Sequence, residues 1–235
     1  MCTVTCLLHN GSLIITSNRD EHIDRPTAAV PEKIKTQIKT NYFARDLEAL
    51  GTWFVADDHK NFAVLLNGGF EKHERVLPYR ESRGIILLDI FNSKDFPNCI
   101  HEFNLERIEP FQLITYHQNS LERWVWDGKI IHHFELEISN PSIFSSATLY
   151  DEYTRNQRKK WFEAFISDTN NCNDVSIFEF HQSYKSINLE EGMTINRNNI
   201  LKTVSISQVV INDTNCVYKY YDMMEDNLFQ YKIRY

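Results

Sequence analysis

Apolar and polar residues follow short strand-like patterns at both ends of the chain, and longer segments between them have helical periodicity. The first two strand-like segments, 2–8 and 12–18, flank an Asn-Gly dipeptide, which strongly favours a tight hairpin turn. The sequence predicts further strands at 52–57, 61–67, 111–117, 121–126, 129–135, 200–211, 216–222 and 228–234. It predicts helices at 81–91, 151–167 and 174–184.

The order of these elements predicts the fold class. Strands, a helix, more strands, two helices and a final group of strands indicate antiparallel sheets with helices segregated on their outer faces. Some strands, such as FAVLL at 62–66, are apolar at both alternating positions, which is typical of sheets covered on both sides. We therefore expect an α+β protein, a four-layer αββα sandwich of antiparallel sheets, formed by a single domain over residues 1–235.

Composition narrows the class of protein. With 42% hydrophobic and 24% charged residues, the chain of 235 residues has the values of a soluble globular protein. A net charge of −7 disfavours nucleic acid or an anionic membrane surface as the main partner. The longest apolar segment, at 62–66, is far shorter than the roughly 18 residues of a membrane span. Because no signal-peptide pattern opens the chain, we expect a cytoplasmic protein. We expect its partner to be a small-molecule substrate or ligand.

Cysteines and histidines show no spacing typical of ligands. The five cysteines are scattered without a C-x-x-C pair, and the nine histidines are dispersed. A disulfide framework or a zinc site needs tighter spacing, and neither of the common glycine-rich phosphate-binding loops is present. We therefore expect no metal and no cofactor. The sequence does not indicate an oligomeric state.

The Asn-Gly turn sets a register that brings reactive groups to the start of the chain. A loop of two or four residues pairs positions whose numbers sum to 21, which places Cys2 opposite Arg19 and Asp20 opposite position 1. If Met1 is removed, Cys2 carries both a thiol and an α-amine, and the amine can take the thiol proton without a histidine. Arg19 would then favour the thiolate and Asp20 would orient the amine. The alternative is an inert, small apolar cysteine beside an ordinary Arg-Asp ion pair.

The same residues resemble the signature of a known family. Met1-Cys2, the segment SNRDE at 17–21 and Arg25-Pro26 are similar to the signature of the NRDE family, which includes the transport-and-Golgi-organisation protein 2 group. Weaker matches follow at 51–53, 67, 82–84 and 111–114, so that the resemblance covers residues 1–165 well. It implies an N-terminal-nucleophile (Ntn) hydrolase fold. It also implies similarity to choloylglycine hydrolases and penicillin V acylases, in which an N-terminal cysteine cleaves amide bonds.

The resemblance also implies roles for individual residues. Cys2 would be the nucleophile, Arg19 and Asp20 its activating neighbours, and Asn67 an oxyanion-hole amide. The two glycines that follow Asn67 would let a backbone approach closely. Trp53 and Phe70 are candidates for the wall of an apolar substrate pocket, although aromatic residues in strands usually belong to the core.

The chain departs from the family pattern at two places. Ser145-Ser146 stands where many members have Ser-Asn, so a second amide donor is missing and Ser146 is the candidate substrate contact. Thr203-Val204-Ser205 stands where relatives often have Thr-Arg-Thr, so an arginine is lost. Loss of one oxyanion donor costs about 10²–10³ in rate. Both departures therefore bear on whether the chain turns over a substrate.

Three functions stay open. The first is a hydrolase that cleaves a non-peptide C–N bond of a small molecule through a thioester on Cys2. The second is a non-catalytic carrier or trafficking protein for haem or for a lipid or acyl metabolite, which the resemblance keeps open. The third is a structural or interaction protein with an inactive site, favoured if Met1 is retained. The basic helical segment 155–160 is expected to be a solvated helix face and not an anion site.

Overall fold

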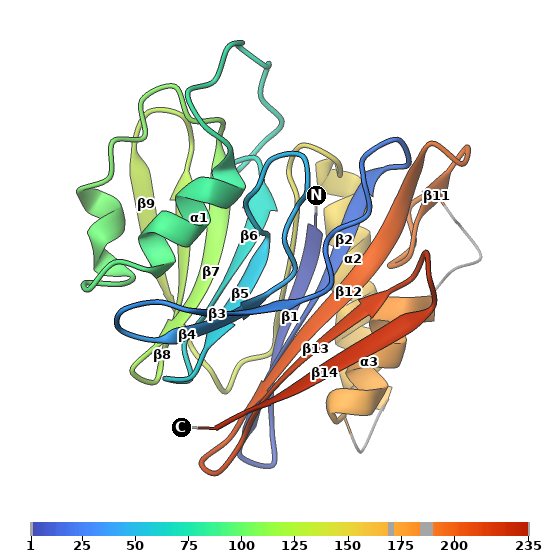
Figure 1. Cartoon of the computed structure of the whole chain (residues 1–235). Helices are drawn as coiled ribbons and strands as arrows, with labels where there is room; N and C mark the ends of the chain where they lie inside the picture. The colour runs from blue at the N-terminus through green and yellow to red at the C-terminus, as the bar shows by residue number, and fades with distance from the viewer. Residues whose placement is uncertain (1, 169–171, 184–189, 235) are drawn as a thin grey trace.

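The computed structural model describes residues 2–168, 172–183 and 190–234. Its strands form two antiparallel sheets packed face to face (Figure 1). The first sheet consists of β10 (Ser142–Ser145), β1 (Cys2–His9), β2 (Ser12–His22), β12 (Leu201–Ile211), β13 (Cys216–Asp222) and β14 (Asn227–Ile233) in this order, with β11 (Asn196–Arg197) beside β12. The second sheet consists of β3 (Glu32–Lys35), β4 (Thr40–Phe43), β5 (Phe54–Asp57), β6 (Phe62–Asn67), β7 (Phe111–His117), β8 (Ser120–Trp126) and β9 (Ile131–Leu136) in sequence order.

Helices cover the outer face of each sheet. The helices of the described residues are α1 (Arg83–Phe91), α2 (Glu152–Asp168), α3 (Asp174–Ser183) and a short 3-10 helix (Asn98–His101). Helix α1 packs against β6 of the second sheet, whereas α2 packs against β10 and α3 against β2 and β12 of the first sheet (Figure 1). The predicted αββα arrangement of layers is therefore confirmed.

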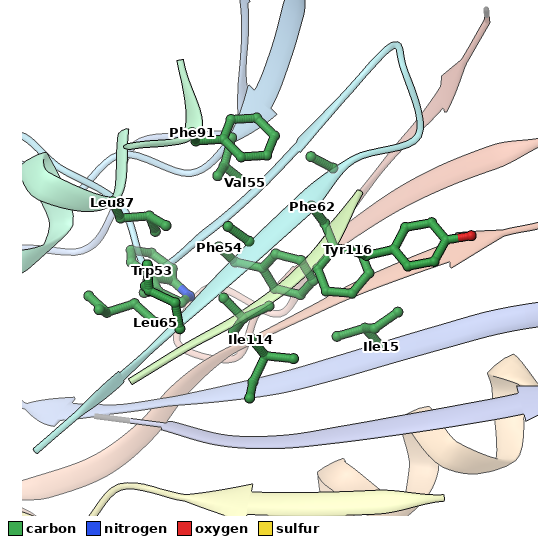
Figure 2. Packing of buried hydrophobic residues seen from close by; sticks show 14 of the residues in the cluster. Ile15, Trp53, Phe54, Val55, Phe62, Leu65, Leu87, Phe91, Ile114 and Tyr116 are labelled. Atoms are coloured by element: carbon green, nitrogen blue, oxygen red, sulfur yellow. The ribbon is translucent and has the colours of Figure 1, made fainter. Parts of the chain in front are cut away.

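The main core fills the space between the sheets and under α1. Helix α1 begins after Ser82, whose side chain accepts a hydrogen bond from the Gly84 N–H, and it turns Leu87 and Phe91 toward the second sheet. These side chains belong to one cluster with Phe54 of β5 and Ile15 of β2, all of them buried (Figure 2). The core therefore connects α1 and both sheets.

Buried polar groups lie between the first sheet and its helices. Arg158 of α2 is completely buried; it donates to Thr3 Oγ1 and to the carbonyl of Gly192, and its guanidinium lies 3.6 Å from the centre of the Tyr150 ring. The prediction of a solvated helix face for 155–160 is therefore wrong at this position. Arg158 is buried because one face of α2 must pack on the sheet, and its donors are satisfied there by a hydroxyl and by backbone carbonyls.

Four strands are absent from the sequence prediction: β3, β4, β10 and β11. Each has only two or four residues, too few to show the alternation of a half-buried strand. The omission of β10 matters for the site, because β10 pairs with β1 and brings Ser145 opposite Thr3. The remaining predicted strands and helices are present, most of them with ends that differ by one or two residues. Strand β2 continues to His22, four residues beyond the predicted end at 18. Part of 174–184 lies outside the described residues.

Candidate active site

The first hairpin places Cys2 beside Arg19. The two residues are paired in the antiparallel ladder, so the predicted register is confirmed. The turn at 10–11 permits this register because its residues have φ of 48° and 72°, the positive values that a tight hairpin turn requires. Directly paired residues have Cα atoms about 4.5–5.5 Å apart. The Cys2 backbone therefore lies next to Arg19, whereas Met1, the position opposite Asp20, lies outside the described residues.

The side chain of Arg19 joins a buried cluster of charges on the face of the first sheet that meets the second. Its Nη2 lies 2.7 Å from Asp46 Oδ2, and its guanidinium carbon lies 4.4 Å from the centre of the Trp53 ring. Arg25 Nε donates to the same oxygen at 2.8 Å. Burial alone raises the pKa of Asp46, but hydrogen bonds from Arg25 and the Ala49 N–H, together with the charge of Arg19, lower it to about 2. Asp46 is therefore ionised at neutral pH and holds Arg19 in place.

A cleft opens beside this cluster. Arg19, Trp53 and Asn67 line a space of about 110 Å³, which is bounded on another side by the start of α1. Asn67 also lines a neighbouring cavity of about 320 Å³, together with Arg83, whose Nη2 lies 3.0 Å from Glu109 Oε2. Within the described residues, the side-chain amide of Asn67 makes no hydrogen bond. Its N–H donors are therefore available to a molecule bound in the cleft.

Asp20 lies on the other, helix-covered face of the first sheet, because successive strand residues point to opposite faces. Tyr150 Oη donates to its Oδ2 and Thr203 Oγ1 donates to its Oδ1, both at 2.6 Å. Asp20 is completely buried, and a buried carboxylate needs such donors. Arg19 and Asp20, predicted to converge on Cys2, therefore approach the end of β1 from opposite sides of the sheet.

Two predicted substrate contacts do not line the cleft that contains Arg19 and Asn67. Ser146 is completely buried, and its hydroxyl donates to the carbonyl oxygen of Asn67 at 2.8 Å. It supports the backbone of Asn67, and its contact with a substrate stays a prediction. Phe70 is 38% exposed and packs its ring edge-on against the ring of His132, with 4.9 Å between ring centres. Trp53 does line the cleft, and its contact with a substrate stays a prediction.

Val204, which stands where relatives often have an arginine, lies at an irregularity in the pairing of β12. The register between β2 and β12 shifts between Thr203 and Ser205, so Val204 forms a β-bulge. Bulges often occur next to active sites, where they redirect a side chain. Val204 lines a small cavity together with Arg19 and Tyr220. Its apolar side chain therefore provides no cation where relatives often have one.

Sequence reasoning missed several charged and polar residues at the site. Arg25 and Arg83 belong to the segments that resemble the family, so their motif positions were an available signal. Asp46 and Tyr150 carry no local signal. They reach Arg19 and Asp20 only because a loop before β5 and the segment before α2 fold back onto the first sheet.

Other groups offer little for a metal. The described residues contain no set of three or more His, Cys, Asp or Glu side chains placed to hold an ion.

Among the helices in this part of the chain, none combines the length and apolar character needed to cross a membrane. Cys6, Cys99, Cys172 and Cys216 are all buried. Burial raises the pKa of Cys6 and of Cys216 to about 12, which makes both thiols unreactive at neutral pH.

With this geometry in view, the family comparison is decisive. The model of the Transport and Golgi organisation 2 family matches residues 1–222. The chain belongs to this family. The match includes β12 and β13, where the resemblance in sequence is weak, and ends before β14. No curated protein matches the chain in sequence.

Solved structures show which fold the family member has. The Caenorhabditis elegans orthologue of N-acylethanolamine-hydrolyzing acid amidase is similar with a TM-score of 0.59 and 9% identity, over 88% of this chain and 92% of that one. A variant of conjugated bile acid hydrolase from Clostridium perfringens, in which leucine replaces an arginine, is similar with a TM-score of 0.54 and 9% identity, over 98% of this chain and 92% of that one. The fold is Ntn-hydrolase-like, as the sequence resemblance implies.

Proposed function

We propose that this protein hydrolyses an amide bond of a small molecule, with Cys2 as the nucleophile after removal of Met1. One observation carries the proposal: Cys2 pairs with Arg19, which lines a cleft together with Asn67. A potential nucleophile, a cation and an amide donor thus belong to one end of the sandwich. The Ntn-hydrolase-like fold supports the reaction class, because two amidases share it.

The reaction needs no group beyond the chain, the substrate and water. The Cys2 sulfur attacks the carbonyl carbon of the substrate while its proton passes to the α-amine. The C–N bond then breaks as the α-ammonium gives the proton to the leaving nitrogen, and the acyl group stays on sulfur as a thioester. Water attacks the thioester carbon and gives a proton to the α-amine. The C–S bond breaks, and the sulfur takes that proton back as the carboxylic acid leaves.

Asn67 is the group of the cleft best suited to the negative charge that develops on the carbonyl oxygen. Its side-chain N–H donors are free within the described residues, and its backbone is held by Ser146. A donor that is fixed before the reaction stabilises the oxyanion without first having to reorganise. Arg19 contributes positive charge to the same cleft, where it favours the thiolate of a neighbouring cysteine.

The test is a screen of a small-molecule amide library by intact-protein mass spectrometry. We expect the protein to lack Met1 and to form acyl adducts that disappear in Cys2→Ala. With a substrate found in this way, Asn67→Ala should lower kcat by about 10²–10³, or about 3–4 kcal/mol, with little change in KM. Asn140→Ala, at an exposed turn, is the matched control and should leave kcat unchanged.

Two results would overturn the proposal. Retention of Met1 would remove the α-amine from Cys2. Tight binding of haem by the purified protein, with no adduct from any amide or ester, would instead support a carrier on the same scaffold.

A further inference from the structure

On the helix-covered face of the first sheet, Tyr150 and Thr203 hold the carboxylate of Asp20. We call these three side chains the carboxylate clamp. Asp20 is completely buried, and hydroxyl groups from two separate segments donate to its two oxygens at 2.6 Å. This distance is typical of strong O–H···O⁻ hydrogen bonds. One donor, Tyr150, precedes α2, and the other, Thr203, lies on β12. Because both oxygens are held, the plane of the carboxylate is fixed relative to the sheet.

The direction of each hydrogen bond follows from the remaining contacts. Thr203 Oγ1 accepts a hydrogen bond from the Ile195 N–H at 2.9 Å, so its own hydrogen is free to point to Asp20. The Tyr150 ring is held by the buried guanidinium of Arg158, 3.6 Å from the ring centre. Each donor of the clamp is thus itself positioned by a neighbouring group.

We propose that Tyr150 and Thr203 are positioning residues, which hold Asp20 so that its carboxylate binds the α-amine of Cys2. This inference rests on the proposed function, because it needs the free amine. It assigns a role in the reaction to the helix-covered face of the sheet, opposite the cleft. The face with Arg19 would bind the substrate, and the face with Asp20 would orient the base.

The charged groups around the clamp come from several elements. Arg158 of α2 lies against the Tyr150 ring, and Arg197 of β11 lies 5.5 Å from the centre of the same ring. On β2, the neighbours of Asp20 in sequence are Arg19 and Glu21, which point to the other face. Removing only the hydroxyl of Tyr150 leaves all four charges and the stacked ring in place.

The experiment is a pH titration by NMR of protein labelled with [13Cβ]cysteine, with the Cys2 signal assigned by its loss in Cys2→Ser. In the wild-type protein we expect two steps for Cys2, with the amine step above the free value of about 7.7–8.0, because the carboxylate favours the ammonium form. In Tyr150→Phe the amine step should move down by about one pH unit, a tenfold change in the proton affinity. Thr203→Val should move it in the same direction.

Tyr221→Phe is the matched control. Tyr221 Oη also donates to an aspartate at 2.6 Å, Asp226 Oδ1, but this pair is on the β13–β14 hairpin. Its removal should leave both Cys2 steps unchanged. Unchanged Cys2 steps in Tyr150→Phe and Thr203→Val, with perturbed steps in the wild type, would overturn the positioning role alone. Free-cysteine behaviour of Cys2 in the wild type, or retention of Met1, would overturn the proposed function as well.

Discussion

We predict that His181 makes the protein less stable in mild acid. It lies on α3 and is completely buried against the first sheet. The side-chain N–H₂ of Asn18 donates to two backbone carbonyls, so its Oδ1 faces His181 Nδ1, which must carry the ring proton. Nε2 then accepts from Thr5 Oγ1 at 2.8 Å. Burial, and secondarily the charge of Arg158, lowers the pKa of His181 from 6.5 to about 3.

The sign and size of the effect follow from proton linkage. The pKa is lowered in the folded state, so the unfolded chain binds the proton more strongly. The stability is fully present above the unfolded pKa of 6.5 and falls as the pH drops toward the folded pKa of about 3. Each pH unit in this window costs about 1.4 kcal/mol. From pH 7.5 to pH 5.0, His181 should therefore lower the free energy of unfolding by about 2 kcal/mol.

Urea unfolding followed by tryptophan fluorescence at the two pH values measures this loss. The wild-type loss should exceed that of His181→Gln by about 2 kcal/mol, because glutamine does not titrate. Ile177→Val, one turn earlier on α3, should be less stable by about 1 kcal/mol at both pH values and keep the wild-type loss. The same pH dependence in the wild type and in His181→Gln would refute a buried neutral histidine.

Two further predictions concern the cleft. Asp46→Asn should lower the free energy of unfolding by about 2 kcal/mol at pH 7 and by less at pH 3, because the carboxylate contributes above its ordinary pKa of 3.8 and loses this contribution as the pH falls through about 2. An equal loss at both pH values in urea titrations would contradict the charge cluster. Gly51→Ala should cost about 1–3 kcal/mol, since its Cβ would lie 2.3 Å from the Gly84 carbonyl carbon and force α1 away from the cleft. Thermal unfolding at an unchanged temperature would show that the two backbones do not approach so closely.

Local patterns in the amino-acid sequence predict much of the fold. The Asn-Gly turn at 10–11 determines the loop length, the loop length determines the register, and the register pairs Cys2 with Arg19. This inference needs only neighbouring residues, because a hairpin is a local structure. The long strands and the helices were predictable for the same reason, since their periodicity extends over enough residues to be recognised.

The site depends on groups that are far apart in the chain. Sequence reasoning placed Arg19 and Asp20 on one site, but alternation along β2 sends them to opposite faces, and only the packed layers show what each one meets. Arg19 meets Asp46 from a loop before β5, whereas Asp20 meets Tyr150, 130 positions away. The Ser146 hydroxyl donates a hydrogen bond to the carbonyl oxygen of Asn67, a contact that requires the two sheets to be adjacent.

The layers of the fold, the first hairpin with its register, and the family were all predictable from the amino-acid sequence. Each of these follows from periodicity, turn chemistry or motif residues that lie close together in the chain. The burial of Arg158, and the hydrogen bonds from Tyr150 and Thr203 to Asp20, become visible only once the layers are packed. A buried charge must be paired with whatever donors and acceptors the packed layers bring next to it, and no local sequence pattern specifies those contacts.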